Sequence, residues 1–241
     1  MDHDLFMKIY NSDGVKFINK MHAHSFSQNI FYGNLRELKE ALNLVENIDI
    51  GIKLMSQEHK EAGTQVYKEV NRLFHNFLSS AKTLIEHTRI FMDTHFKNTN
   101  VNTEYTHKIK MEFSQDELSR FIQDLRNYML HQGLPHNQMS FKIDNKDPDN
   151  QEIESTISLD IEKLIEWSRW SSGSKKYLNK QNQNLKLSVL VEEYSQKIIS
   201  LNEWLEKALY DYHNKELKEL EELQNKYQEQ TNSDLATLNR T

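Results

Sequence analysis

Cysteine is absent from this sequence of 241 residues, and proline and glycine are scarce, with 2 and 6 occurrences. Without cysteine there is no disulfide framework, no thiol nucleophile and no cysteine-based metal site. A fold rich in β-sheet needs many turns built from proline and glycine, so their scarcity indicates long helices with few connections. The composition therefore predicts an all-α protein.

Long apolar runs are also missing. No window approaches the roughly 20 consecutive apolar residues that span a lipid bilayer. The N-terminal stretch MDHDLFMKIYNSDG carries acidic residues where a secretory signal carries positive charge. We therefore expect no membrane association and a cytoplasmic location.

The balance of charge is acidic, with a formal net charge of −6 at pH 7. This weighs against an extensive nucleic-acid interface, which needs many basic residues to neutralise phosphates. Much of the acid collects between Glu203 and Glu222, however. A local site for RNA elsewhere in the chain stays open.

Several sequence motifs of known chemistry are missing as well. The 11 histidines do not form His-Glu-x-x-His, and His22-Ala-His24 is too short and isolated to indicate a metal site. Neither the nucleophile motif Gly-x-Ser-x-Gly nor the phosphate-binding motif Gly-x-x-x-x-Gly-Lys occurs. We therefore expect no metal and no cofactor.

Apolar residues spaced by three and four positions predict helices along most of the chain. The expected helices cover residues 34–57, 57–96, 114–133, 161–170 and 185–228. Residues 1–33 show no sustained period, and residues 97–108 and 171–184 resemble polar connections. We expect a single helical domain with a core at about residues 34–210 and an extended C-terminal helix to about residue 228.

One stretch has the alternation of a β-hairpin. MSFKID and STISLD alternate apolar with polar residues and flank a loop, Asn145–Glu152, that contains Asp-Pro-Asp-Asn. This predicts one small hairpin, at about residues 139–160, inserted in a helical bundle.

The helix at 114–133 has the clearest boundaries. Ser114 and Glu117 have the spacing of a capping box, in which each side chain accepts a hydrogen bond at the helix start. Gly133 followed by Pro135 is a typical stop signal. We expect this helix to pack antiparallel to the helix at 57–96, because the link between them is short.

This helix carries Arg126-Asn127-Tyr-Met-Leu-His131, which resembles the motif of the HEPN superfamily of helical proteins. The family motif is an arginine, a polar residue directly after it, and a histidine after four to six intervening residues. Arg89 and His95 have a compatible spacing, but an apolar residue follows Arg89. The stretch from Asp124 to Pro135, and the stretch NFLSSAKTLIEHTR before it, resemble a group of bacterial HEPN-like proteins.

The resemblance covers about Val66 to Pro135 and implies a function. HEPN ribonucleases are homodimers with the active site between the subunits, and they cleave RNA without a metal to leave a 2′,3′-cyclic phosphate. The resemblance therefore implies a homodimeric endoribonuclease that acts as a regulated toxin or defence effector, with RNA as substrate and an antitoxin or other regulatory protein as partner.

The three residues of the motif suit this chemistry. A histidine with a pKa of about 6.5 exchanges protons at neutral pH, and an arginine holds a phosphate through paired donors. Asn127 can orient either group. On a helix with 3.6 residues per turn, Asn127 and His131 lie about 40° apart, whereas Arg126 lies about 140° from His131. A single protomer supplies one arginine, one asparagine and one histidine. Two copies around one cleft would supply two of each.

Other interpretations stay open at this point. Arg126 can pair with a carboxylate while His131 caps carbonyl groups at the helix end. His87 and Arg89 can support the site from the facing helix or form a plain solvated edge. Trp167 and Trp170, followed by lysines, suit either an RNA-binding surface or, more simply, the core. The alternative function is that of a non-catalytic helical dimer that binds a protein or nucleotide partner.

Overall fold

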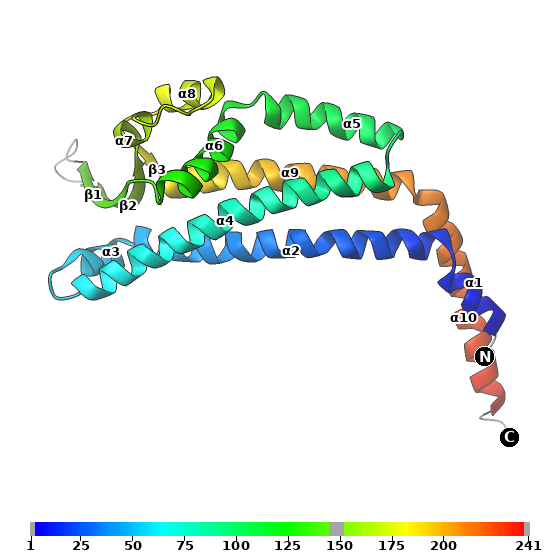
Figure 1. Ribbon diagram of the computed structural model, residues 1–241. Coiled ribbons are helices and arrows are strands. Elements are labelled where there is room, and N and C mark those ends of the chain that lie inside the picture. Colours follow the sequence, from blue (N-terminus) through cyan, green and yellow to red (C-terminus); the bar gives the residue numbers. More distant parts are fainter. Residues whose placement is uncertain (1–2, 145–151, 239–241) are drawn as a thin grey trace.

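Three long helices form the body of the protein, seen here in a computed structural model that describes residues 3–144 and 152–238. These helices are α2 (Asp13–Glu46), α4 (Lys60–His95) and α9 (Leu187–Tyr212), and they lie side by side (Figure 1). Their apolar faces meet in one core, which includes Phe31, Leu38, Phe74, Phe77 and Leu190. The mostly helical fold expected from composition is confirmed.

The N-terminal part is helical much earlier than expected. A short helix, α1 (His3–Tyr10), precedes α2, which begins where Ser12 accepts a hydrogen bond from the N–H of Val15. The predicted start at residue 34 is wrong. Positions 17, 21, 24, 27 and 31 are buried at helical spacing, but two of them are His24 and Ser27, so the apolar pattern is interrupted. A break at Asn47 then separates α3 (Ile48–Met55).

The helices α4 and α6 (Glu117–Gln132) match the predicted segments 57–96 and 114–133. They pack together, and α6 runs back toward the end of the bundle that holds the sheet (Figure 1). The predicted capping box is wrong, because Asp116 caps α6 by accepting from the N–H of Ser119 at 2.8 Å. Ser114 lies in a preceding π-helix, η1 (Lys110–Ser114). Gly133 ends the helix with a φ of 98°, as its sequence predicts.

Two segments expected to be polar connections are helical. Residues 100–109 form α5 (Asn100–Ile109), which buries Val101 and Tyr105, and Ser172–Asn179 form α8, which buries Tyr177 and Leu178. The buried stripe of each helix is narrow, so most residues in both segments are polar and the helical pattern is hard to recognise in the sequence. Both helices begin at a hydroxyl cap, Thr99 and Ser171.

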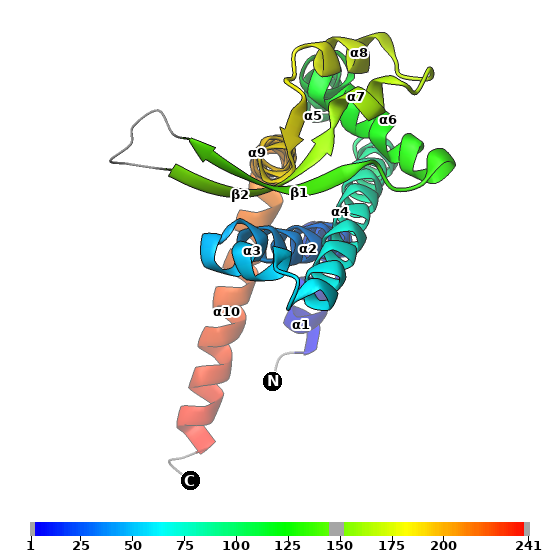
Figure 2. The ribbon, with the colours of Figure 1, turned by 90° about the vertical axis from the view of Figure 1, so that its left-hand side faces the viewer.

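The predicted hairpin is confirmed and belongs to a three-stranded antiparallel sheet. β1 (Asn137–Asp144) pairs with β2 (Glu152–Asp160), with Met139 opposite Ile157, and β2 pairs with β3 (Asn184–Lys186). The sheet lies at one end of the bundle, between α9 on one side and α2 and α3 on the other (Figure 2). The predicted loop Asn145–Glu152 lies outside the described residues except for its last residue.

After the hairpin, α7 (Ile161–Ile165) is shorter than the predicted helix at 161–170. The long C-terminal helix is also divided, because α9 ends at Tyr212 and α10 (Asn214–Leu238) follows after His213. α10 and α1 extend together from the end of the bundle opposite the sheet (Figure 1). At their base Gly14 permits close packing, since a Cβ there would lie 2.7 Å from the carbonyl oxygen of Glu216.

Candidate functional site around helix α6

The helix α6 presents three different faces. One face is the predicted core stripe, of which Phe121, Ile122, Leu125 and Met129 are buried. The second face turns toward a cavity beneath α5 and η1, and the third faces solvent near the last turn. The residues of the Arg126-Asn127-xxx-His131 motif are divided between the second and third faces.

Arg126 is half-buried and lines the cavity with residues of α4, α5, η1 and α9. Its Nε atom is shielded from solvent and has no hydrogen-bond partner among the described residues. No described carboxylate lies within 4.0 Å of its guanidinium group, so the interpretation that Arg126 serves an ion pair is wrong. The adjacent Asp124 is engaged elsewhere, since it accepts hydrogen bonds from the Ser171 N–H at 2.8 Å and the Ser174 hydroxyl at 2.6 Å.

His131 and Asn127 lie on the solvent face. His131 is exposed and Asn127 is half-buried, one turn apart on the helix. In the described part of the chain His131 makes no hydrogen bond to the carbonyl groups at the end of α6, so a capping role is not observed. Neither residue lines the cavity that contains Arg126. Within one protomer the motif is therefore separated into an arginine that lines the cavity and an asparagine–histidine pair that does not.

Beside the last turns of α6 lies an open polar cleft of about 630 Å³. Tyr128 and Gln132 form its α6 wall, and the facing wall comes from α7 and the residues after it. That wall includes Lys163, Glu166, Trp167 and Arg169, and His136 completes the lining. Residues three and four apart are neighbours on a helix, so His131 lies beside Tyr128, which lines this cleft. His131 itself is not part of the lining.

The chemistry of this cleft suits a nucleic acid. Its aromatic groups are already ordered, with the rings of Tyr128 and Trp167 edge to face at 5.3 Å. Arg169 forms no ion pair with a described residue, whereas Lys163 is 3.2 Å from Glu166. Single-stranded nucleic acids are bound by cations that contact phosphates and by aromatic faces that stack on bases. Sequence reasoning missed His136, Lys163 and Arg169, because they form no motif and meet only in the folded chain.

The two tryptophans have different roles. Trp170 is buried, and its indole N–H donates to the Leu164 carbonyl at 2.6 Å, which confirms the simpler interpretation as core. Trp167 is only half-buried, and it contributes to the cleft. The tryptophan pair therefore supports the cleft without forming an exposed aromatic surface.

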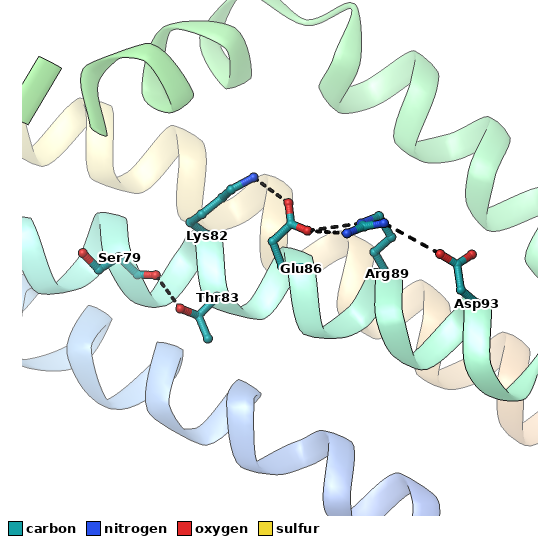
Figure 3. A network of polar contacts seen from close by, with 6 residues as sticks. All are labelled: Ser79, Lys82, Thr83, Glu86, Arg89 and Asp93. Atoms are coloured by element: carbon teal, nitrogen blue, oxygen red, sulfur yellow. Dashed lines mark hydrogen bonds and ion pairs between the residues drawn. The ribbon is translucent and has the colours of Figure 1, made fainter. Parts of the chain in front are cut away.

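The predicted supporting residues, His87 and Arg89, lie on α4 away from this cleft. His87 faces α2, where its Nδ1 is 2.6 Å from the Ser27 hydroxyl. Arg89 is part of a row of alternating charges along α4 (Figure 3). It lies 2.8 Å from Glu86, which also holds Lys82 at 2.6 Å, and 3.9 Å from Asp93. The hydrogen bonds from Lys82 and then Arg89 lower the pKa of Glu86, so this row is an internally neutralised surface.

Comparisons with known proteins do not assign the chain to a family. No protein-family model matches the sequence, and neither a curated protein nor a solved structure is significantly similar to it. Within residues 3–144 and 152–238, no three histidine, aspartate or glutamate side chains are grouped so that they could hold a metal ion. In the same part of the chain, no helix has the length and apolar content needed to cross a bilayer.

Proposed function

We propose that this protein is a metal-independent endoribonuclease whose active site includes the solvent face of α6 and the polar cleft beside it. The observation that carries this proposal is the position of His131. It is an exposed histidine on the turn of α6 next to Tyr128, which lines a cleft that combines ordered aromatic rings with Arg169. Arg169 forms no ion pair with a described residue. The HEPN-like motif, identified from sequence, provides the reaction class.

In this proposal His131 exchanges a proton with the 2′-hydroxyl group or with the leaving 5′-oxygen. Attack of the 2′-oxygen on the phosphorus breaks the bond to the 5′-oxygen, and the products are a 2′,3′-cyclic phosphate and a free 5′-hydroxyl. Negative charge develops on the phosphate during this step, and an arginine stabilises it through paired hydrogen bonds. Asn127, one turn from His131, orients the imidazole or the phosphate.

A second copy of the chain completes the site in this proposal. Leu130 and Leu134 flank His131 and are each 56% exposed, which leaves apolar side chains uncovered next to a charged site. A two-fold axis near them brings two copies of His131 and Asn127 together, as the HEPN resemblance implies. A regulatory protein partner, an antitoxin in the toxin setting, covers the same face in the inactive state.

The alternative function is a non-catalytic dimer that binds a protein or nucleotide partner. The separation of Arg126 from His131 favours this alternative, because a nuclease of HEPN type uses both. A ribonuclease needs the exposed His131 to form an RNA cleavage product, whereas a non-catalytic dimer forms no such product.

The experiment is incubation of the purified protein with mixed RNAs in excess chelator, followed by analysis of the product ends. We expect 2′,3′-cyclic phosphates and an activity lowered about 10²–10⁴-fold by His131→Ala, as for loss of a general acid or base. His75→Ala is the matched control, since His75 is an exposed helical histidine on α4. Cleavage that requires Mg²⁺, or equal activity of His131→Ala and His75→Ala, would contradict the proposal.

A further inference from the structure

We propose that the cavity lined by Arg126 is a binding site for a small organic anion that consists of an apolar ring and a single carboxylate or phosphate group. The cavity has a volume of about 140 Å³ and lies where α4, α5, η1, α6 and α9 meet. It does not include Asn127 or His131. The cavity thus lies apart from the asparagine–histidine pair of the proposed ribonuclease site, and its ligand does not depend on that function.

The charge of the cavity favours an anion. Arg120 and Arg126 both line it, and neither forms an ion pair or side-chain hydrogen bond with a described residue. A third cation, Lys82, is already held by Glu86 at 2.6 Å. A shielded guanidinium atom without a partner is unfavourable, and a bound anion relieves that penalty through charge-assisted hydrogen bonds. The buried Nε of Arg126 therefore points to a missing ligand group.

The rest of the wall is mostly apolar. Leu78 and Ile85 from α4, Ile122 from α6 and Phe113 from η1 contribute to it. An apolar cavity of about 150 Å³ is large enough to hold benzene. The volume and the lining together select one ring or a short branched chain, with its charged group directed at the two arginines. A bare inorganic anion would leave the apolar part unfilled.

The local backbone is adapted to this cavity. η1 is a single turn of π-helix, a form that is rare and occurs frequently at functional sites. It directs Phe113 inward, where the Lys197 ammonium lies 6.0 Å from the ring centre. Lys197 in turn is 3.3 Å from Asp116, the cap of α6. Lys197 thus connects Phe113, which lines the cavity, with the residue that caps α6.

The test is calorimetric titration of the whole protein with phenyl phosphate, benzoate, benzyl alcohol and inorganic phosphate. We expect saturable binding by at least one of the two ring anions, and binding at least about tenfold weaker for the neutral alcohol and for phosphate alone. Whether phenyl phosphate or benzoate binds more tightly identifies the anionic group. Binding is measured without RNA, so loss of ribonuclease activity does not affect the result.

Three variants complete the test. Arg126→Gln and Arg120→Gln should each weaken binding of the ring anion about tenfold or more. Arg36→Gln, at an exposed position of α2, should leave binding unchanged. Ile85→Phe should reduce binding by filling the cavity while the circular dichroism spectrum stays that of the parent protein. Absence of saturable binding by both ring anions, or full affinity in folded Arg126→Gln, would overturn the proposal.

Discussion

Two arginines beside α6 are candidates for holding the phosphate, and they differ in their surroundings. Arg126 belongs to the sequence motif but lines the cavity, whereas Arg169 lines the open cleft together with Tyr128 and Gln132 of α6. Sequence reasoning does not find Arg169, because it is distant from α6 along the chain and meets Tyr128 and Gln132 only in the folded protein. Which arginine acts on RNA is therefore a question for substitution.

We expect Arg169→Gln to lower RNA cleavage, by roughly 10²-fold if one donor to the transition state is lost. Arg126→Lys should be equally damaging only if its guanidinium leaves the cavity to reach the RNA, since a lysine cannot reproduce its planar fork. Initial rates on one RNA would be compared with those of Arg36→Gln. A full rate in Arg169→Gln would exclude the cleft as the phosphate site.

We expect His24 to make the stability of the protein sensitive to acid. It is buried in α2, stacks on Phe91 at 4.6 Å, and its Nε2 has no described hydrogen-bond partner. Burial, and then the nearby His87, lower its pKa below the ordinary 6.5. Lys20 and His95 line the same hollow and add no negative charge. The charged form of His24 is therefore disfavoured in the folded protein.

The sign of the pH effect follows from linkage. As the pH falls below about 6.5, the unfolded chain binds a proton at this histidine and the folded chain does not, so the free energy of unfolding decreases until the folded pKa is reached. His24→Phe keeps the ring stack and should remove part of that decrease. Urea unfolding at about pH 7 and about pH 5 measures this decrease in the free energy of unfolding. His22→Phe, at an exposed position, should keep the pH dependence of the parent, and an unchanged dependence in His24→Phe would contradict this account.

At the scale of elements, the predictable helices are those with a wide and continuous apolar face. α4 and α6 have such faces, and their positions are confirmed. The start of α2 was missed because polar His24 and Ser27 occupy buried positions, and α5 was missed because its stripe consists of Val101 and Tyr105. Tertiary packing makes these segments helical, and a single sequence does not reveal that packing.

The start of α6 shows how a local motif can mislead. Ser114 and Glu117 match a capping box, but the π-helix extends the preceding helix through Ser114 and leaves Asp116 to cap α6. Asp116→Ala should therefore lower the free energy of unfolding by about 1 kcal/mol, as expected for loss of an N-cap. Ser114→Ala, at an exposed position, should change it little.

Thermal unfolding of both variants and of Asp116→Asn would test this assignment. Asparagine retains the capping oxygen and removes the charge that faces Lys197 at 3.3 Å, so it should be destabilised less than the alanine variant. A larger loss in Ser114→Ala than in Asp116→Ala would restore the capping box as the start of the helix.

At the scale of the whole molecule, different elements form the two ends of the bundle and the surroundings of the candidate site. The sheet closes one end of the bundle, α1 and α10 extend from the other, and α6 packs against both α4 and α8 (Figures 1 and 2). The apolar stripe and the stop signal predict the helix, and they place the motif residues off its core face. They do not predict the cleft or the inward direction of Arg126, because both depend on α5, α7 and η1, and their packing has no signature in the sequence.

Association of two copies through the α6 end is the prediction that belongs to this scale. Leu130 and Leu134 are exposed on either side of His131, and covering both would remove apolar area from water next to the site. We expect a dimer by light scattering at micromolar concentration. Glutamate at both positions (Leu130→Glu with Leu134→Glu) should yield a folded monomer, because neither side chain contributes to the core.

Met111→Glu is the matched control, since Met111 is 51% exposed on η1, away from the last turn of α6. It should leave the dimer intact. If the double glutamate variant loses RNA cleavage together with dimerisation, while His131 is unchanged, the second copy supplies part of the site. A parent protein that is monomeric yet cleaves RNA would instead place the whole site within one chain. His131 and the cleft with Arg169 would then have to suffice without any contribution from a second copy.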